Sequence, residues 1–247
     1  GMESLIKTQI ALDKTNGLDV ILMEEPENHL GFTTLRKMLQ EIANKQDESQ
    51  IIIATHNNMI ASRLNLNNVL WITEEGVKSL LDVDKAVADF FVRADDNAFL
   101  QLLLSKKVFL VEGATEFLLL PHFYAQITNH TIEEDGVSVI SCNGISYQKY
   151  LAIAKATGKK IAVITDNDRK EDNISKSRDF NKTNGMQHIF MGSTIADWTW
   201  EICVYNANKT VLDEMIDVQA GANYLFHDKD YGKVPGKMLN NKVDTAY

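Results

Sequence analysis

Cysteine is scarce in this sequence, where Cys142 and Cys203 are the two thiols among 247 residues. A single pair cannot build the disulfide framework of a small secreted domain, and isolated thiols suit a reducing compartment, where they pack as small apolar side chains. Long apolar runs are also absent. No stretch approaches the roughly 20 residues that span a bilayer, and the first residues show no signal-peptide pattern. We therefore expect a cytoplasmic protein that does not enter a membrane.

Positive charge is in deficit as well. Lysine and arginine together number 25 against 34 acidic residues, which gives a formal net charge of −9. A protein that coats DNA by neutralising phosphates is usually basic, so this balance argues against such a role. It is compatible with an enzyme whose metal site is acidic. The composition, 45% hydrophobic with only three prolines, is that of an ordinary globular protein of one large or two ordinary domains.

Apolar strands alternate with amphipathic helices in two separate parts of the chain. The first part predicts a strand, a helix and a strand, followed by a hairpin that begins at residue 68. These three elements span residues 17–25, 33–46 and 49–56. Continuous apolar strands connected by helices favour the α/β class, with parallel sheets covered on both faces.

The same pattern restarts beyond a helical stretch. Three apolar strands, the first two followed by helices, predict a second α/β unit. Residues 170–185 are polar and rich in turn formers, so we expect a loop there. We therefore divide the chain into residues 1–83, a helical connection at 84–104, and a second domain at 105–247.

Two consecutive carboxylates, Glu24 and Glu25, end the first apolar strand. In P-loop nucleotide hydrolases such a pair forms the Walker B element, in which the first acid holds Mg²⁺ and the second polarises the attacking water. His56 ends the next strand, where a histidine can sense a γ-phosphate. The strings EEPENHL and TH resemble the C-terminal half of an ABC-type ATPase of the SMC/Rad50-like branch. That resemblance makes Glu24 the metal acid, Glu25 the catalytic base and His56 the switch histidine.

The phosphate-binding motifs of such an ATPase are missing from this sequence. The nearest string to G-x-x-x-x-G-K-[ST] is GKVPGKM at residues 232–238, which has the wrong spacing and no Ser or Thr after its lysine. No LSGGQ-like signature is present either. We therefore expect a fragment that begins past these motifs and neither binds nor hydrolyses ATP appreciably. ATP is then a ligand of the full-length protein only, in which the ATPase part is expected to form a homodimer.

Two further strands of the second unit also end in carboxylates. VFLVEG places Glu112 at a strand end with Glu116 one helical turn onward, and IAVITDND places Asp166 and Asp168 at another. The two aspartates share a face if the chain is still extended there. Because neighbouring strand ends of an open parallel sheet converge, these four acids would repel one another unless cations neutralise them. Mg²⁺ or Mn²⁺ prefers such oxygen ligands, and two ions about 4 Å apart can promote phosphodiester hydrolysis.

The succession EGxxE and D-x-D resembles the Toprim domain of topoisomerases, DnaG-type primases and several nucleases. An ABC-type ATPase tail followed directly by Toprim is similar to the overcoming-lysogenization-defect (OLD) family of ATP-dependent nucleases. The resemblance covers nearly the whole chain and includes LSKKVFLVEGATEFLLLP and the glycine turn at Gly144. It implies a Rossmann-like Toprim fold and a bacterial cytoplasmic enzyme connected to phage defence.

The OLD resemblance adds two residues near the C-terminal end. Glu201, within DWTWEICVYNAN, maps onto a further metal carboxylate of the family. Lys242, within NNKVDTAY, maps onto the lysine that stabilises charge on the phosphate in the transition state. Lys233 and Lys237 compete with Lys242 for this role.

Other residues near the acids suggest contacts with a nucleic acid. Arg169 and Lys170 stand where other Toprim proteins often carry a glycine, and they are placed to contact a DNA backbone. Trp198 and Trp200 are candidates for stacking on a base, although we expect at least one of them to be a core residue.

Two functions remain open from the sequence. The first is a Toprim endonuclease that cuts or nicks DNA with Mg²⁺ or Mn²⁺, coupled to ATP hydrolysis in the full-length protein. The second is a non-catalytic DNA-binding or regulatory Toprim module in a recombination or repair ATPase. The intact acid set favours the endonuclease, whereas the choice of DNA over RNA is not fixed by any motif.

Overall fold

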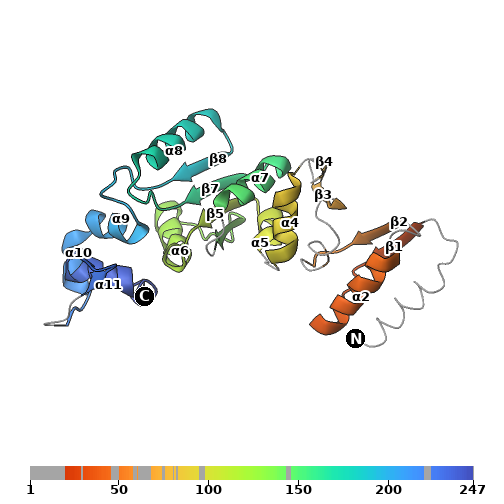
Figure 1. Cartoon of the computed structure of the whole chain (residues 1–247), viewed down its shortest axis with the longest axis horizontal. Coiled ribbons are helices and arrows are strands. Elements are labelled where there is room, and N and C mark those ends of the chain that lie inside the picture. The colour runs from red at the N-terminus through yellow and green to blue at the C-terminus, as the bar shows by residue number, and fades with distance from the viewer. Residues whose placement is uncertain are drawn as a thin grey trace. The chain divides into compact units, whose positions relative to one another are not determined.

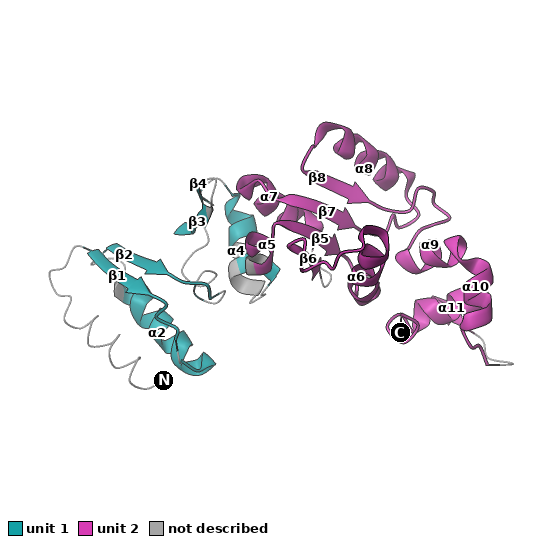
Figure 2. Cartoon of the chain, turned by 180° about the vertical axis from the view of Figure 1, so that it is seen from behind, with its two compact units in different colours: residues 1–100 teal, residues 101–247 magenta. Residues whose placement is uncertain are grey.

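The computed structural model describes most of the second half of the chain and separate stretches of the first half. The described residues are 20–28, 30–45, 50–57, 60, 68–73, 76–79, 81, 83–94, 98–142, 146–219 and 224–246. Gly144, which we expected to form a turn, lies outside them. The chain divides into two compact units, residues 1–100 and residues 101–247 (Figure 2).

The first unit contains a small parallel sheet with a helix on one face. Strand β1 (Val20–Glu24) pairs in parallel with β2 (Gln50–Ala54), and α2 (Phe32–Lys45) connects them (Figure 1). Apolar side chains of α2 pack on one face of the sheet together with Ile21. The other face was expected to be covered as well, but Leu22 is 74% exposed and Ile52 is 50% exposed. That expectation is wrong for the described residues, since α2 supplies apolar contacts to one face only.

The remainder of the first unit matches the sequence pattern closely. The expected hairpin is confirmed: β3 (Leu70–Thr73) and β4 (Gly76–Ser79) pair antiparallel. The helical stretch that follows consists of α4 (Lys85–Ala94) and α5 (Ala98–Leu104), the second of which crosses the boundary between the units.

A four-stranded parallel sheet forms the centre of the second unit. Its strand order is β6-β5-β7-β8. The strands are β5 (Lys107–Val111), β6 (Val137–Ser141), β7 (Lys160–Ile164) and β8 (Gln187–Phe190), and all adjacent pairs are parallel. The expected α/β class with a Rossmann-like parallel sheet is therefore confirmed.

Helices connect these strands and cover the sheet. They are α6 (Ala114–Thr128), α7 (Tyr147–Thr157) and α8 (Glu171–Thr183). Because β6 and β7 lie on opposite sides of β5, right-handed crossovers place α6 and α7 on opposite faces. Val111, Val137 and Val139 pack with Leu120 of α6 in one core cluster. This packing fixes the start of α6, and with it Glu116, beside the end of β5.

The polar segment after β7 differs from expectation, because residues that we predicted to form a loop form helix α8. The segment EDNISKSRDFNKT has little apolar character, and Ile174 and Ser177 are the buried residues of this helix. Glu171 and Asp172 lie in its first turn, where carboxylates favourably oppose the helix dipole. Contact with β8 then supplies the stability that the hydrophobic pattern does not show.

The C-terminal part of the second unit is built from short elements. They are α9 (Trp200–Ala207), α10 (Lys209–Met215), β9 (Leu225–Phe226), β10 (Lys229–Asp230) and α11 (Lys233–Asn240). Helix α9 contacts both α6 and α11, so the C-terminal segment is held beside the start of α6. None of the described helices is long and apolar enough to cross a membrane.

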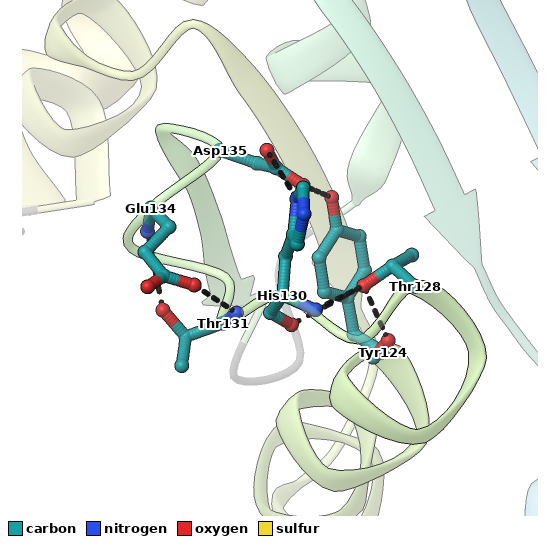
Figure 3. Close-up of polar contacts among 6 residues, drawn as sticks. All are labelled: Tyr124, Thr128, His130, Thr131, Glu134 and Asp135. Carbon is teal, nitrogen blue, oxygen red and sulfur yellow. Dashed lines mark hydrogen bonds and ion pairs between the residues drawn. The ribbon is translucent and has the colours of Figure 1, made fainter.

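A polar network closes the connection between α6 and β6 (Figure 3). The Tyr124 hydroxyl donates to Asp135, and the ring of His130 lies 3.4 Å from the same carboxylate. Thr131 and Glu134 exchange hydrogen bonds between side chain and backbone. The hydrogen bond to Tyr124 lowers the pKa of Asp135 and raises that of Tyr124. This network lies at the amino end of β6, which leaves the opposite end of the sheet for the acidic residues.

Candidate functional site

The acidic residues of the second unit meet at the carboxyl ends of β5 and β7. These strands are adjacent, with Val111 opposite Ile164, so the residues that follow them come together. One oxygen of Glu112 accepts hydrogen bonds from the Thr165 hydroxyl at 2.8 Å and from the Asp166 backbone N–H at 3.1 Å. Glu112 therefore binds the first turn of the chain after β7 directly.

Two buried glutamates come from helix starts beside these strand ends. Glu116 lies in the first turn of α6 and Glu201 in the first turn of α9, and they are 4% and 2% exposed. One oxygen of Glu201 lies 3.0 Å from the Lys242 ammonium and 3.3 Å from the Thr115 hydroxyl. The other oxygen is buried without a hydrogen-bond partner. A buried, unpaired carboxylate oxygen is unfavourable, and it is compatible with a cation-binding site.

Asp166 is the group most affected by the negative charge. Its side chain accepts a 3.0 Å hydrogen bond from the backbone N–H of Trp200, at the start of α9. Burial, followed by the negative charge of Glu112, raises the pKa of Asp166 to about 7. Burial also raises the pKa of Glu116, with the charges of Glu201 and Glu112 adding to the effect.

Lys242 is the cation that partly balances these acids. Burial would lower the pKa of its ammonium, but the charges of Glu201, Asp166 and Glu116 outweigh this and raise it. Three of the four carboxylates interact with Lys242, so one positive charge leaves an excess of negative charge in the cluster. This excess favours a further cation.

Asp168 stands apart from the other acids. The chain is not extended after Asp166, because residue 168 has a φ of 54° and the Lys170 N–H closes a turn onto the Asn167 carbonyl. The Asp168 side chain is 61% exposed and lies 3.6 Å from the Lys170 ammonium. The condition for a shared face of the two aspartates is therefore not met in this structure.

The acidic residues provide the ligand type of a divalent metal site, but their side chains are not spaced as metal ligands are. Among the residues that the structure describes, no three His, Cys, Asp or Glu side chains are arranged to hold an ion. The donors are nevertheless all carboxylate oxygens, which Mg²⁺ and Mn²⁺ prefer. The unpaired oxygen of Glu201 and the raised pKa values of Asp166 and Glu116 are compatible with a site for a divalent cation.

Asn167 organises this site, and the sequence analysis missed it. Its side chain is fully buried, and its amide nitrogen lies within hydrogen-bond distance of the carbonyls of Gly192, Thr194 and Asp197. Its amide oxygen accepts from the Arg169 N–H at 2.8 Å. The turn that carries both aspartates is thus fixed to the loop between β8 and α9. The sequence shows only that an asparagine stands between two aspartates. This is weak evidence for a structural role, because any residue type can occupy the middle of a D-x-D string.

A cavity of about 570 Å³ opens beside Asp166. Its walls come from the end of β8 and from α9, and include Phe190, Trp200 and Cys203. Burial, followed by the charge of Asp197, raises the pKa of the Cys203 thiol to about 11, so the thiol stays protonated at neutral pH. Trp200 packs on the core around Val111, which confirms the expectation that at least one of Trp198 and Trp200 is a core residue.

The first unit brings Glu25 and His56 together. Glu25 follows β1 with a φ of 40°, and its N–H donates to the Ala54 carbonyl. Its carboxylate accepts from the Asn28 amide at 2.8 Å and lies 3.1 Å from the His56 ring. These contacts, with Asn28 the stronger, lower the pKa of Glu25. Glu24 is exposed at the end of β1, in register with Ala54.

Glu27 is a second residue that the sequence analysis missed. It is 7% exposed, accepts a short hydrogen bond from the Thr55 hydroxyl, and has one buried oxygen without a partner. Thr55 also accepts from the Asn57 N–H at 2.9 Å. Glu27 thereby joins the turn after β1 to the end of β2, which positions Glu25 and His56.

Part of the sequence is similar to known proteins. Residues 103–168 match the family model described as the overcoming lysogenization defect protein-like TOPRIM domain. This segment is therefore similar to an OLD-like Toprim domain. The matched residues include Glu112, Glu116, Asp166 and Asp168, whereas Glu201 and Lys242 lie beyond them.

A curated relative supports the same assignment. The chain is 25% identical to the Old nuclease of Escherichia phage P2 over 167 residues, which cover 63% of the chain and 28% of the relative. The chain thus spans less than a third of that protein's length. The resemblance to the OLD family that was inferred from the sequence is confirmed. Toprim domains generally use divalent metal ions.

Proposed function

We propose that the second unit is a metal-dependent endonuclease that hydrolyses phosphodiester bonds in DNA. The OLD-like Toprim domain and the similarity to a phage nuclease support a nuclease-type function in general. The observation that carries the specific proposal is the buried acid cluster around Asp166. The cluster holds four carboxylates, one with a pKa of about 7 and another with an unpaired oxygen, and three of them interact with Lys242.

We propose Mg²⁺ or Mn²⁺ as the metal, with two ions. Four of the residues that would hold it lie in the OLD-like segment, and a fifth lies beyond it. They are Glu112, Glu116, Asp166, Asp168 and Glu201. A bound divalent ion in such a site lowers the pKa of water and polarises the phosphate. Asp168 is 61% exposed, so a change in the turn that it shares with Lys170 is required before it can join the others.

Lys242 is the best placed of the three competing lysines to oppose charge on the phosphate. Its ammonium lies 3.0 Å from Glu201, inside the acid cluster. The Lys237 ammonium instead donates to the Asp217 carbonyl, and Lys233 is exposed at the start of α11. Catalysis by Lys242 consists of electrostatic stabilisation of the developing charge.

The test is cleavage of supercoiled plasmid with Mg²⁺ or Mn²⁺ and no ATP. We expect nicking by the wild-type chain, and its loss by a factor of at least about 100 in Asp166→Asn and Glu112→Ala. The matched control is Asp179→Asn, which makes the same substitution at a carboxylate that is 73% exposed on α8. Cleavage that survives Asp166→Asn or EDTA would contradict the proposal.

The second candidate is a non-catalytic DNA-binding or regulatory Toprim module. One observation favours it: in the described residues the acids are close but not arranged to hold an ion, and Asp168 is turned to solvent. Such a module would bind DNA equally well in wild type and Asp166→Asn and would cut in neither. The plasmid assay therefore separates the two functions.

For the first unit we propose the C-terminal part of an ABC-type ATPase. The contact of 3.1 Å between Glu25 and His56 is compatible with a catalytic base beside a switch histidine. Glu24, exposed at the end of β1, is the proposed metal acid. ATP binding and a homodimer through this part are proposed for the full-length protein only, since the sequence carries no P-loop. A cytoplasmic location and a role in phage defence are likewise part of this proposal.

A further inference from the structure

We propose that Arg169, held between Trp198 and Tyr231, is a preformed site for a DNA phosphate next to the catalytic carboxylates. The inference rests on the proposed function, because it supplies a contact for the strand that the nuclease would cut. It assigns a role to a cluster, defined here as Arg169, Trp198 and Tyr231, that lies outside the acid set.

The cluster fixes the guanidinium group from two directions. The Arg169 guanidinium carbon lies 4.2 Å from the centre of the Trp198 ring and 5.2 Å from that of Tyr231. One guanidinium nitrogen also donates to the Tyr231 hydroxyl. The two rings are themselves 5.7 Å apart, and Phe226 packs against Trp198. An arginine held in this way loses less conformational entropy when it binds a ligand.

Among the residues that the structure describes, the guanidinium of Arg169 has no acidic partner within ion-pair distance, although Asp168 precedes it. Arginine has five N–H donors, of which one side-chain donor binds Tyr231. The remaining donors form a planar fork that matches two oxygens of a phosphate. The chain has a net charge of −9, so a fixed arginine without a nearby carboxylate is unusual in it and suggests a site for an anion.

Backbone hydrogen bonds place this cluster next to the acid site. The Asn167 N–H donates to the Trp198 carbonyl at 3.2 Å, and the Trp200 N–H donates to Asp166 at 3.0 Å. Arg169 follows Asp168 directly, and its φ of 60° turns it out of the strand direction. A DNA strand whose scissile phosphate lies at Asp166 is therefore within reach of Arg169 through a neighbouring phosphate.

A purely structural role is the alternative. Tyr231 lies in the C-terminal segment that also carries Lys242, so Arg169 could serve only to fix this segment to the D-x-D turn. The two roles differ in their salt dependence. A phosphate contact releases counterions from DNA, and its loss reduces the slope of log K against log [salt] by about 0.9 for duplex DNA. The loss of a structural contact leaves the slope unchanged.

The experiment measures binding of a short fluorescent DNA duplex by anisotropy between 50 and 200 mM salt. The parent protein is the Asp166→Asn chain, which the proposed mechanism makes inactive and in which the amide oxygen can still accept from Trp200. Arg169→Ala and Arg169→Lys are compared with it. Arg36→Ala is the matched control, since Arg36 also lies over an aromatic ring, Phe32, at 5.5 Å in the first unit.

We expect Arg169→Ala to weaken binding about tenfold, the value of a hydrogen bond to a charged group, and to reduce the salt slope by about 0.9. Arg169→Lys should keep the slope but bind more weakly than the parent, since lysine lacks the fork. Equal slopes for Arg169→Ala and the parent, equal effects of Arg169→Ala and Arg36→Ala, or no binding by the parent would each overturn the inference. Plasmid cleavage by the wild-type chain tests the proposed function separately, so its failure is not confused with failure at Arg169.

Discussion

The carboxyl group of Asp166 links the charge of the site to the stability of the fold. Its pKa in the folded protein is about 7, above the value of about 3.9 for an unfolded chain. The folded state therefore keeps a proton that the unfolded state has released between about pH 4 and pH 7. Since the folded state binds more protons, stability falls as pH rises through this window and changes no further above it.

The substitution Asp166→Asn should remove the loss of stability that accompanies a rise in pH. Without metal, we expect the variant to be more stable than wild type at pH 8, with a smaller difference or none at pH 5, as measured by thermal unfolding in EDTA. Mn²⁺ should stabilise wild type more at pH 8 than at pH 5, because the metal competes with the proton. The exposed Asp179→Asn serves as the control. An effect of Asp166→Asn that is the same at both pH values would show that burial does not raise this pKa.

The ion pair between Lys242 and Glu201 gives a second prediction. Lys242→Ala should lower the free energy of unfolding by about 1 to 2 kcal/mol, because it leaves the charge of Glu201 buried and unpaired. This is less than the 3–5 kcal/mol typical of a fully buried pair, since the Lys242 side chain is 45% exposed and screened by solvent. Lys233→Ala, at an exposed position on α11, should change stability by less than about 0.5 kcal/mol.

Urea unfolding of the two lysine variants checks this prediction. Adding Glu201→Gln to Lys242→Ala should recover part of the loss, because the neutral amide no longer needs a cation. If Lys242→Ala and Lys233→Ala were equally stable, the contact at 3.0 Å would have no energetic role.

The sequence allowed a better prediction of which residues form the acid cluster than of how these residues are arranged. Glu112 and Asp166 follow apolar strands, and parallel pairing brings such strand ends together without further information. Glu201 and Lys242 lie far along the chain, and only the family resemblance connected them with the site. Asp168 is the counterexample, since period-2 spacing assumes an extended chain and the left-handed conformation at residue 168 ends it. That turn depends on the buried amide of Asn167, a tertiary contact that local pattern does not contain.

Gly192 lies in the loop between β8 and α9, and this loop helps to position Asp166. A Cβ atom at Gly192 would lie 1.8 Å from the Asp197 carbonyl oxygen, so the backbone would have to move. The same loop accepts the hydrogen bonds of Asn167 and leads to Trp200, which donates to Asp166. Gly192→Ala should therefore lower stability by about 1 to 3 kcal/mol, the usual cost of overpacking, and reduce metal-dependent nicking.

Gly185→Ala is the matched control for this substitution. No atom lies within 4 Å of a Cβ at Gly185, so this variant should keep both stability and nicking. Urea unfolding and the plasmid assay measure the two effects. A Gly192→Ala protein that unfolds and nicks as wild type does would show that the close approach of residues 192 and 197 is not required.

Strands and helices were predictable where burial imposes a pattern. β5, β6 and β7 are continuous apolar runs because both faces of a parallel sheet are covered. α8 was missed because two buried residues among thirteen leave no apolar stripe. The helical segment after Trp198 consists of two short helices, α9 and α10, that meet at Asn208. An asparagine is compatible with an interruption of a helix, but its presence in a sequence does not predict one.

The residues proposed for the two activities lie in different units of the chain. All acids proposed for the nuclease, together with Lys242 and Arg169, lie in residues 101–247, which form a compact unit with their own core. The pair of Glu25 and His56 lies in the other unit and belongs to a proposed ATPase site that has no P-loop lysine in this sequence. The two activities should therefore be separable in this chain.

Glu25→Gln and His56→Ala should consequently leave plasmid nicking by this chain within about twofold of wild type. ATP should not change the rate, since the carboxylates of Glu24 and Glu25 cannot replace the backbone N–H groups with which a P-loop binds phosphates. Nicking rates with and without ATP, and calorimetric titration with ATP, measure this. Micromolar affinity for ATP would contradict the expectation that this chain does not bind ATP. A tenfold loss of nicking in Glu25→Gln, with the same thermal stability as wild type, would show that the first unit acts on the second.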